Sequence, residues 1–99
     1  MKSFPNDKDT DNVIIILKML ADRTRLKIVY TLMSGAKCVG EIVSSVGESQ
    51  SAISHQLATM KESNLVKSDR CGNKIIYSIS DEHVSKVVKL CLEHAREIE

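Results

Sequence analysis

Hydrophobic and polar positions follow two different periods along this chain. Over the first two thirds, apolar residues recur three or four positions apart, which is the period of an amphipathic helix. This spacing predicts four helices, at residues 13–20, 23–34, 39–46 and 50–63. The first is apolar almost all round, so we expect it to be buried. The period then shortens to that of two strands, at residues 65–70 and 74–80 with a turn at 71–73, before a last helix that follows Asp81.

The ends of these predicted helices carry residues that commonly begin or stop a helix. Asp22, Ser49 and Asp81 each stand just before a helix, where a side-chain oxygen accepts a hydrogen bond from a free backbone N–H. Gly35 and Gly47 follow two of the helices, where a left-handed backbone closes the last turn. Five helices and one hairpin in this order predict a mainly α fold with a β-hairpin wing.

The composition is that of one globular domain. Of the 99 residues, 42% are apolar and 27% charged, and the net charge is only +1. Residues 1–11 are polar and are expected to form a flexible N-terminal arm, with residues 12–99 as the folded domain. The longest apolar run, residues 13–17, is too short to span a bilayer, and three cysteines without a secretory signal argue against a disulfide framework. We therefore expect a cytoplasmic protein with no membrane partner.

The third and fourth predicted helices, separated by a tight turn at residues 47–49, form a helix-turn-helix pattern. The second helix of such a pair enters the major groove of DNA with its N-terminal residues at the base edges. The residues in that position are Gln50, Ser51, Ser54 and His55. The following hairpin offers cations for phosphate contacts, namely Lys67, Arg70 and Lys74. Serine and glutamine here would also cap a solvated helix, but their order with the basic hairpin favours double-stranded DNA as the partner.

Four potential metal ligands lie on the last helix. These are Asp81, His83, His94 and Glu97. His83 and His94 fall within about 20° of each other around the helix axis, yet they lie about 16 Å apart along it. A zinc ion, with bonds of about 2.0 Å to nitrogen, cannot reach both on one helix. An antiparallel second copy would bring His83 against His94 and Asp81 against Glu97 of the other chain, with two equivalent sites per dimer.

The donor set favours zinc. Two imidazoles and two carboxylates suit tetrahedral Zn(II), with Co(II) as a possible substitute, whereas Cd(II), Pb(II) and As(III) prefer thiolates. Chance placement is the alternative, because Asp81 has an independent role as a helix cap and a glutamate near a C-terminus is commonly solvated. The matching positions of the two ligand pairs favour the metal site.

The motifs together resemble those of the ArsR/SmtB family of metal-responsive repressors. The matching stretches are LADRTRLKI at residues 20–28, SQSAISH at 49–55, Leu65-Val66 and IYSI at 76–79, and the similarity spans roughly residues 13–98. This resemblance implies a winged helix-turn-helix homodimer paired through its first and last helices. It also implies that Asp81, His83, His94 and Glu97 match the interprotomer site of the family's zinc sensors.

Three positions depart from the family pattern. Arg23 replaces a frequent proline, and Gln56 stands where many members have a second histidine. The family's other common metal site needs a Cys-x-Cys pair, of which only Cys38 is present. These departures leave the site on the last helix as the candidate sensor.

The predicted function is a repressor that binds an inverted-repeat operator as a dimer. It would release the operator on binding Zn(II) or Co(II) and so derepress efflux or sequestration genes. The route from metal to DNA is expected to be a hydrogen bond from the second N–H of His94 to a backbone carbonyl at residues 63–65.

Three other functions are alternatives to this prediction. An enzyme is disfavoured because four protein ligands would close the zinc sphere, and no nucleophile–base pair or small organic substrate site is evident. A repressor of the same fold that responds to oxidants or persulfides through Cys38 and Cys91 stays open, as does a constitutive DNA-binding protein whose metal only stabilises the dimer.

Overall fold

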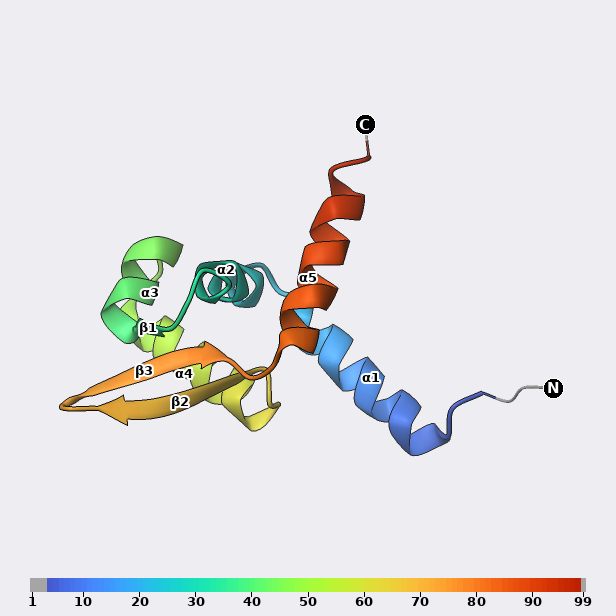
Figure 1. Ribbon diagram of the computed structural model, residues 1–99, viewed down its shortest axis with the longest axis horizontal. Helices are drawn as coiled ribbons and strands as arrows, with labels where there is room; N and C mark the ends of the chain where they lie inside the picture. The colour runs from blue at the N-terminus through green and yellow to red at the C-terminus, as the bar shows by residue number, and fades with distance from the viewer. Residues whose placement is uncertain (1–3, 99) are drawn as a thin grey trace.

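The computed structural model describes residues 4–98 and has the five helices and the hairpin expected from the sequence (Figure 1). In chain order its elements are α1 (Asp7–Leu20), α2 (Arg23–Leu32), β1 (Lys37–Cys38), α3 (Val39–Val46), α4 (Gln50–Glu62), β2 (Val66–Cys71), β3 (Lys74–Ile79) and α5 (Glu82–Ala95). The mainly helical winged helix-turn-helix prediction is confirmed. Strand β1 was not predicted, because two residues carry no period of their own.

The three predicted N-terminal caps are present, whereas α2 ends at Leu32 rather than at residue 34, so Gly35 does not close its last turn as expected. The side chain of Asp22 accepts the N–H of Arg25 at 2.9 Å, Ser49 accepts that of Ala52 at 3.1 Å, and Asp81 accepts that of His83 at 2.9 Å. Gly47 closes α3 in a left-handed conformation, with φ of 85°. This conformation is open to glycine at little cost, and it turns the chain from α3 into α4.

Helix α1 differs from its prediction in two respects. It begins at Asp7 rather than at residue 13, because the Asn6 side chain accepts the N–H of Asp9 at 2.8 Å and acidic residues in the first turn favour a helix N-terminus. Its apolar residues are not buried within the chain, since residues 11–18 are all exposed and only Leu20 is buried. Part of the expected arm is therefore helical, residues 1–3 of it lie outside the described residues, and the division at residue 12 stays a prediction.

The core lies where α2, α3, α4 and the start of α5 meet the sheet. Its fully enclosed side chains are aliphatic or methionine: Ile28, Val29, Ile42, Ile53, Leu57, Met60, Leu65 and Val66. The sheet has the strand order β1-β3-β2 and is antiparallel throughout. Strands β2 and β3 close through a two-residue turn in which Gly72 has φ of 67° and Cys71 faces Lys74.

Helices α1 and α5 project away from this core, whereas the wing extends on the opposite side (Figure 1). Among the described residues, no helix combines the length and the apolar character needed to cross a membrane. The arrangement separates the molecule into a head made of α3, α4 and the wing, and a pair of protruding helices.

Candidate DNA-binding and metal-binding sites

Helix α4 presents the four predicted base-reading residues to solvent. Gln50, Ser51, Ser54 and His55 are all exposed. The opposite face of α4 is fixed by Ile53, Leu57 and Met60, which are 0% exposed. The buried face orients the helix, so its N-terminal turn stands free to enter a DNA groove.

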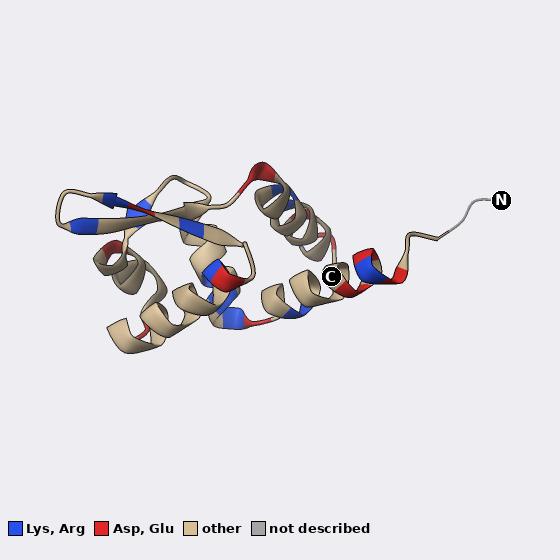
Figure 2. Ribbon diagram, turned by 90° about the horizontal axis from the view of Figure 1, so that it is seen from below, with Lys and Arg blue, Asp and Glu red and all other residues tan. Residues whose placement is uncertain are grey.

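The wing carries its cations in exposed positions. Lys67 and Arg70 on β2 and Lys74, the first residue of β3, are exposed, and Figure 2 shows the basic positions of the wing in blue. Register pairs Lys67 with Ser78 and Arg70 with Ile75. The wing therefore offers positive charge beside α4, the predicted DNA-reading helix (below, the reading helix), as phosphate contacts require.

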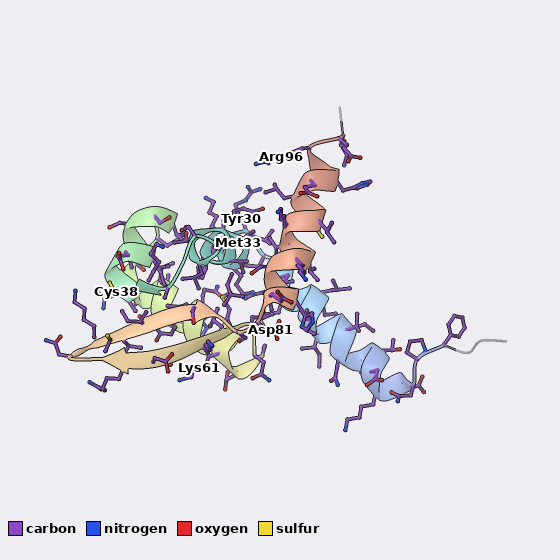
Figure 3. All side chains as sticks on the ribbon, in the orientation of Figure 1. Tyr30, Met33, Cys38, Lys61, Asp81 and Arg96 are labelled. Atoms are coloured by element: carbon purple, nitrogen blue, oxygen red, sulfur yellow. The ribbon has the colours of Figure 1, made fainter. Side chains whose placement is uncertain are left out.

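Lys61, near the end of α4, makes a contact that the sequence analysis did not predict. Its Nζ donates to the Ser68 hydroxyl at 2.7 Å, which joins the end of α4 to β2 (Figure 3). Seven residues and a change of element separate the two, so no helical spacing signals the contact. The bond ties the reading helix to the wing.

Glu41 on α3 accepts a hydrogen bond at the start of its own helix, which lowers its pKa. Its Oε1 accepts the backbone N–H of Cys38 at 2.9 Å. Hydrogen bonding from Cys38 lowers the pKa of the Glu41 carboxyl, and the positive charges of Lys37 and Lys74 lower it further. The Glu41 carboxylate thus competes with a DNA phosphate for the positive charge of Lys74.

The four predicted metal ligands form two pairs at opposite ends of α5. Asp81 Oδ1 lies 3.2 Å from His83 Nδ1, and His94 Nδ1 lies 3.7 Å from Glu97 Oε1. All four side chains are more than half exposed. Within residues 4–98, no three His, Cys, Asp or Glu side chains gather closely enough to hold a metal. Each pair supplies one imidazole and one carboxylate, which fits half of a tetrahedral nitrogen and oxygen site.

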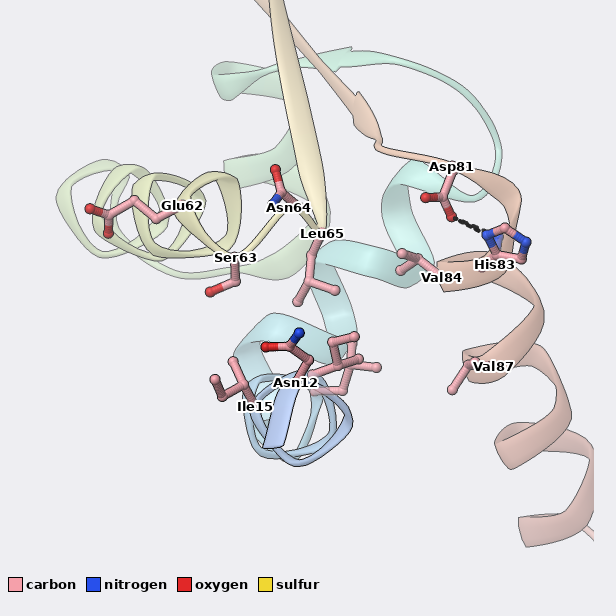
Figure 4. Close-up of a pocket in the computed structure, with 12 residues that line it drawn as sticks. Asn12, Ile15, Glu62, Ser63, Asn64, Leu65, Asp81, His83, Val84 and Val87 are labelled. Atoms are coloured by element: carbon pink, nitrogen blue, oxygen red, sulfur yellow. Dashed lines mark hydrogen bonds and ion pairs between the residues drawn. The ribbon is translucent and has the colours of Figure 1, made fainter. Parts of the chain in front are cut away.

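A groove of about 540 Å³ adjoins the Asp81–His83 pair (Figure 4). Ile15 of α1 lines one wall of the groove. Residues 62–65, at and after the end of α4, and the first turn of α5 line the others. The backbone N–H of Ser80 donates to the carbonyl of Leu65 at 3.1 Å beside it. This bond extends the pairing of β2 with β3 by one residue, and it joins the segment that follows α4 to the segment that precedes α5.

His94 lies toward the other end of α5, away from residues 63–65 (Figure 1). The hydrogen bond expected between His94 and a carbonyl in that segment is not made within one chain. A second chain would have to supply that histidine, as it would for the metal set.

All three cysteines are free. Cys38 precedes α3, on the far side of α2 from α5, which carries Cys91 (Figures 1 and 3). Cys71 is exposed in the wing. The fold therefore does not pair Cys38 with Cys91 inside one chain.

Comparison with known proteins identifies the family. Residues 22–68 match the sequence profile of the family described as bacterial regulatory protein, arsR family. The cadmium resistance transcriptional regulatory protein CadC homolog of Staphylococcus aureus is 34% identical over 88 residues, which cover 88% of this chain and 73% of the relative.

Solved structures agree with this assignment. The AntR antimony-specific transcriptional repressor is 31% identical and superposes with a TM-score of 0.84, covering 99% of this chain and 91% of the other. A homodimeric winged helix-turn-helix DNA-binding domain from Mycobacterium bovis is 29% identical with a TM-score of 0.84, covering 98% and 92%. These relatives are regulators rather than enzymes, and the chain belongs to the ArsR/SmtB family of DNA-binding transcriptional regulators.

Proposed function

We propose that this chain is a dimeric, zinc-responsive repressor in the bacterial cytoplasm. It binds an inverted-repeat operator and leaves it when Zn(II), or Co(II), binds at two sites shared between the protomers, which derepresses efflux or sequestration genes. The observation that carries this proposal is the division of the ligands into two complementary pairs, Asp81 with His83 and His94 with Glu97, at opposite ends of one exposed helix.

The exposed apolar residues of α1 and α5 support the dimer. Val13, Ile15 and Leu17 are 52%, 53% and 52% exposed, and Leu90 on α5 is 64% exposed. A cluster of large apolar side chains in water marks an interface more often than a free surface. Pairing through both helices would cover it and complete each ligand set, and the similar domain from Mycobacterium bovis is described as homodimeric.

The choice of zinc rests on the donor atoms. The relatives named for cadmium and antimony respond to ions that prefer sulfur ligands. The candidate set here holds two imidazoles and two carboxylates, and none of the three free cysteines belongs to it. Borderline ions that accept four nitrogen and oxygen ligands in tetrahedral geometry are Zn(II) and Co(II).

The proposed link to DNA runs through the partner's His94. A metal-bound histidine usually donates its other ring N–H to a carbonyl or carboxylate. Residues 63–65, which follow α4, line the groove beside Asp81 and His83. The Leu65 carbonyl already accepts from Ser80, but a carbonyl oxygen has a second lone pair for another donor.

The decisive experiment is a DNA-binding titration with and without Zn(II). Wild-type protein should bind an inverted repeat selected from random DNA and release it on adding zinc. His94→Ala should bind the same DNA and fail to release it, whereas Glu93→Ala, an exposed neighbour on α5, should behave like wild type. Release from His94→Ala at wild-type zinc concentrations would contradict the proposal.

The redox alternative predicts a different result in the same assay. Peroxide or persulfide, but not zinc, would then release the wild-type protein, and Cys38→Ser or Cys91→Ser would abolish the effect. The constitutive alternative predicts no release by either treatment.

A further inference from the structure

The Arg25 guanidinium joins three elements of the fold. Its Nε donates to the carbonyl of Met19 in the last turn of α1 at 2.6 Å, and its Nη1 donates to Oε1 of Gln56 on α4 at 2.9 Å. Its Nη2 lies 4.0 Å from the carboxylate of Asp22, which caps α2. One side chain of α2 therefore touches both the protruding helix α1 and the reading helix α4.

The surroundings of Arg25 favour a fixed position. Its side chain is only 20% exposed. The Met19 carbonyl belongs to the last turn of α1, where carbonyls lack helical partners and a positive charge is stabilising. Hydrogen bonds from a charged donor are stronger than neutral ones. The guanidinium thus closes the end of α1 and uses its remaining N–H groups to hold α4.

The hydrogen bond to Gln56 constrains the orientation of α4 relative to α2 more tightly than apolar core packing does. The hydrophobic effect itself is non-directional and ridge-into-groove packing leaves a scatter of crossing angles, whereas the planar fork of a guanidinium fixes the geometry of its acceptors. Arg25 and Gln56 are 31 residues apart, farther than any other side-chain hydrogen-bonded pair in the described chain. Gln56 follows His55 directly, so its position bears on that of the reading residues.

We propose that Arg25 is a positioning residue that sets the angle between α1 and α4 through Met19 and Gln56. This inference rests on the proposed dimeric function. If two copies pair through α1, the angle between α1 and α4 sets the distance between the two reading helices. Arg25 thereby tunes the half-site spacing that the dimer accepts, which for such dimers is about one helical turn of DNA.

The test measures spacing preference rather than affinity alone. Wild-type protein is first used to select an inverted repeat from random DNA. Each variant is then titrated with this duplex and with duplexes whose half-sites are one base pair closer or farther apart. Thermal unfolding monitored by circular dichroism confirms that every variant folds.

Arg25→Lys and Gln56→Met should each lose at least about fivefold of the wild-type preference for the selected spacing. Their double mutant should lose little more, because both changes break one contact. Gln56→Glu keeps an acceptor for Arg25 and should keep the spacing preference, even if its added negative charge weakens all DNA binding. Thr31→Val is the matched control, since it removes a 2.9 Å hydrogen bond from α2 to Ser45 on α3 and leaves α4 untouched.

Unchanged spacing preference in both Arg25→Lys and Gln56→Met would overturn the inference, as would an equal loss in Thr31→Val. A purely structural role would lower affinity for all three duplexes by the same factor, which also counts against positioning. Failure of the wild type to select any inverted repeat would instead overturn the proposed function, so the two failures are distinguishable.

Discussion

Ser80 donates its backbone N–H to the carbonyl oxygen of Leu65 at 3.1 Å. Ser80 immediately precedes Asp81, the first residue of the candidate metal set, and Leu65 follows the end of α4. The bond adds one pair to the end of the β2–β3 ladder, so it links the segment after α4 to the segment before α5 within one chain. This contact and the proposed bond from the partner's His94 meet at the same few carbonyls.

Metal stoichiometry is the first prediction. The dimer should bind two Zn(II), because each site needs a pair of ligands from both chains. Cobalt substitution should give a tetrahedral visible spectrum without an intense sulfur-to-metal charge-transfer band. His83→Ala should abolish both sites, whereas Cys91→Ser should leave the spectrum unchanged. A strong thiolate band would contradict the nitrogen and oxygen ligand set and would indicate that a cysteine binds the metal.

Operator recognition is the second. Ser54→Ala or His55→Ala should weaken operator binding by about tenfold while zinc binding stays near wild type, because both side chains are exposed at the N-terminal half of α4. Wild-type binding should weaken steeply with added salt as phosphate contacts release counterions. Fluorescence anisotropy measures both effects, with Ser34→Ala, exposed after α2, as the control. Normal operator binding by both α4 variants would place the reading surface elsewhere.

Coupling between metal and DNA is the third. His94→Asp retains a ligand but lacks a second N–H, so it should keep some zinc binding and lose most of the coupling. Allosteric couplings typically change affinity by about 5- to 150-fold, and the effect of DNA on zinc affinity must equal that of zinc on DNA affinity. Isothermal titration calorimetry with and without operator tests this equality. Full coupling in His94→Asp would require another route, such as a tightening of the whole dimer.

The dimer interface is the fourth. Leu90→Glu places a charge on the exposed apolar face of α5 and should give a monomer that no longer binds zinc at two sites per pair of chains. Leu90 is 64% exposed in the single chain, so the substitution should not unfold it. Ile75→Glu on the wing is the control, because Ile75 is 43% exposed and lies outside α1 and α5. Sedimentation velocity distinguishes the two species, and a dimeric Leu90→Glu would exclude this face.

The fifth prediction concerns the effect of Glu41 on DNA affinity and on the pH dependence of stability. Its carboxylate lies near enough to Lys74 for each charge to affect the other, so Glu41→Gln should strengthen DNA binding on the order of twofold by freeing Lys74 for phosphate. Glutamine keeps an acceptor for the Cys38 N–H. Because the folded pKa of Glu41 is lowered, its contribution to stability is present above the ordinary glutamate pKa and is lost as pH falls through the folded value.

Urea unfolding at several acidic pH values tests the second part of this prediction. Wild type should lose slightly more stability than Glu41→Gln as pH falls. Identical acid-side profiles, together with unchanged DNA affinity, would show that Glu41 interacts with neither Cys38 nor Lys74 in solution.

Local signals in the chain were sufficient for the five helices, the hairpin and the N-terminal caps of three helices. Helix and strand periods depend on residues a few positions apart, and a cap such as Asp22 or Ser49 forms its hydrogen bond within three residues. Gly47 likewise marks the turn between α3 and α4 through its own backbone freedom. The winged helix-turn-helix, the solvent-exposed face of α4 and the two pairs of candidate ligands at the ends of α5 all follow from such short-range patterns.

Packing decided what those patterns leave open. Strand β1 exists because Cys38 pairs with Ile76, and Arg25 reaches Gln56 only when α2 and α4 have packed together. Helix α1 is longer than predicted because its first turn is polar, and hydrophobic spacing gives no signal there. Its apolar residues stay exposed because no other element within residues 4–98 covers them. Contacts between distant residues arise only after the core brings their elements together, and nothing in either local sequence encodes that meeting.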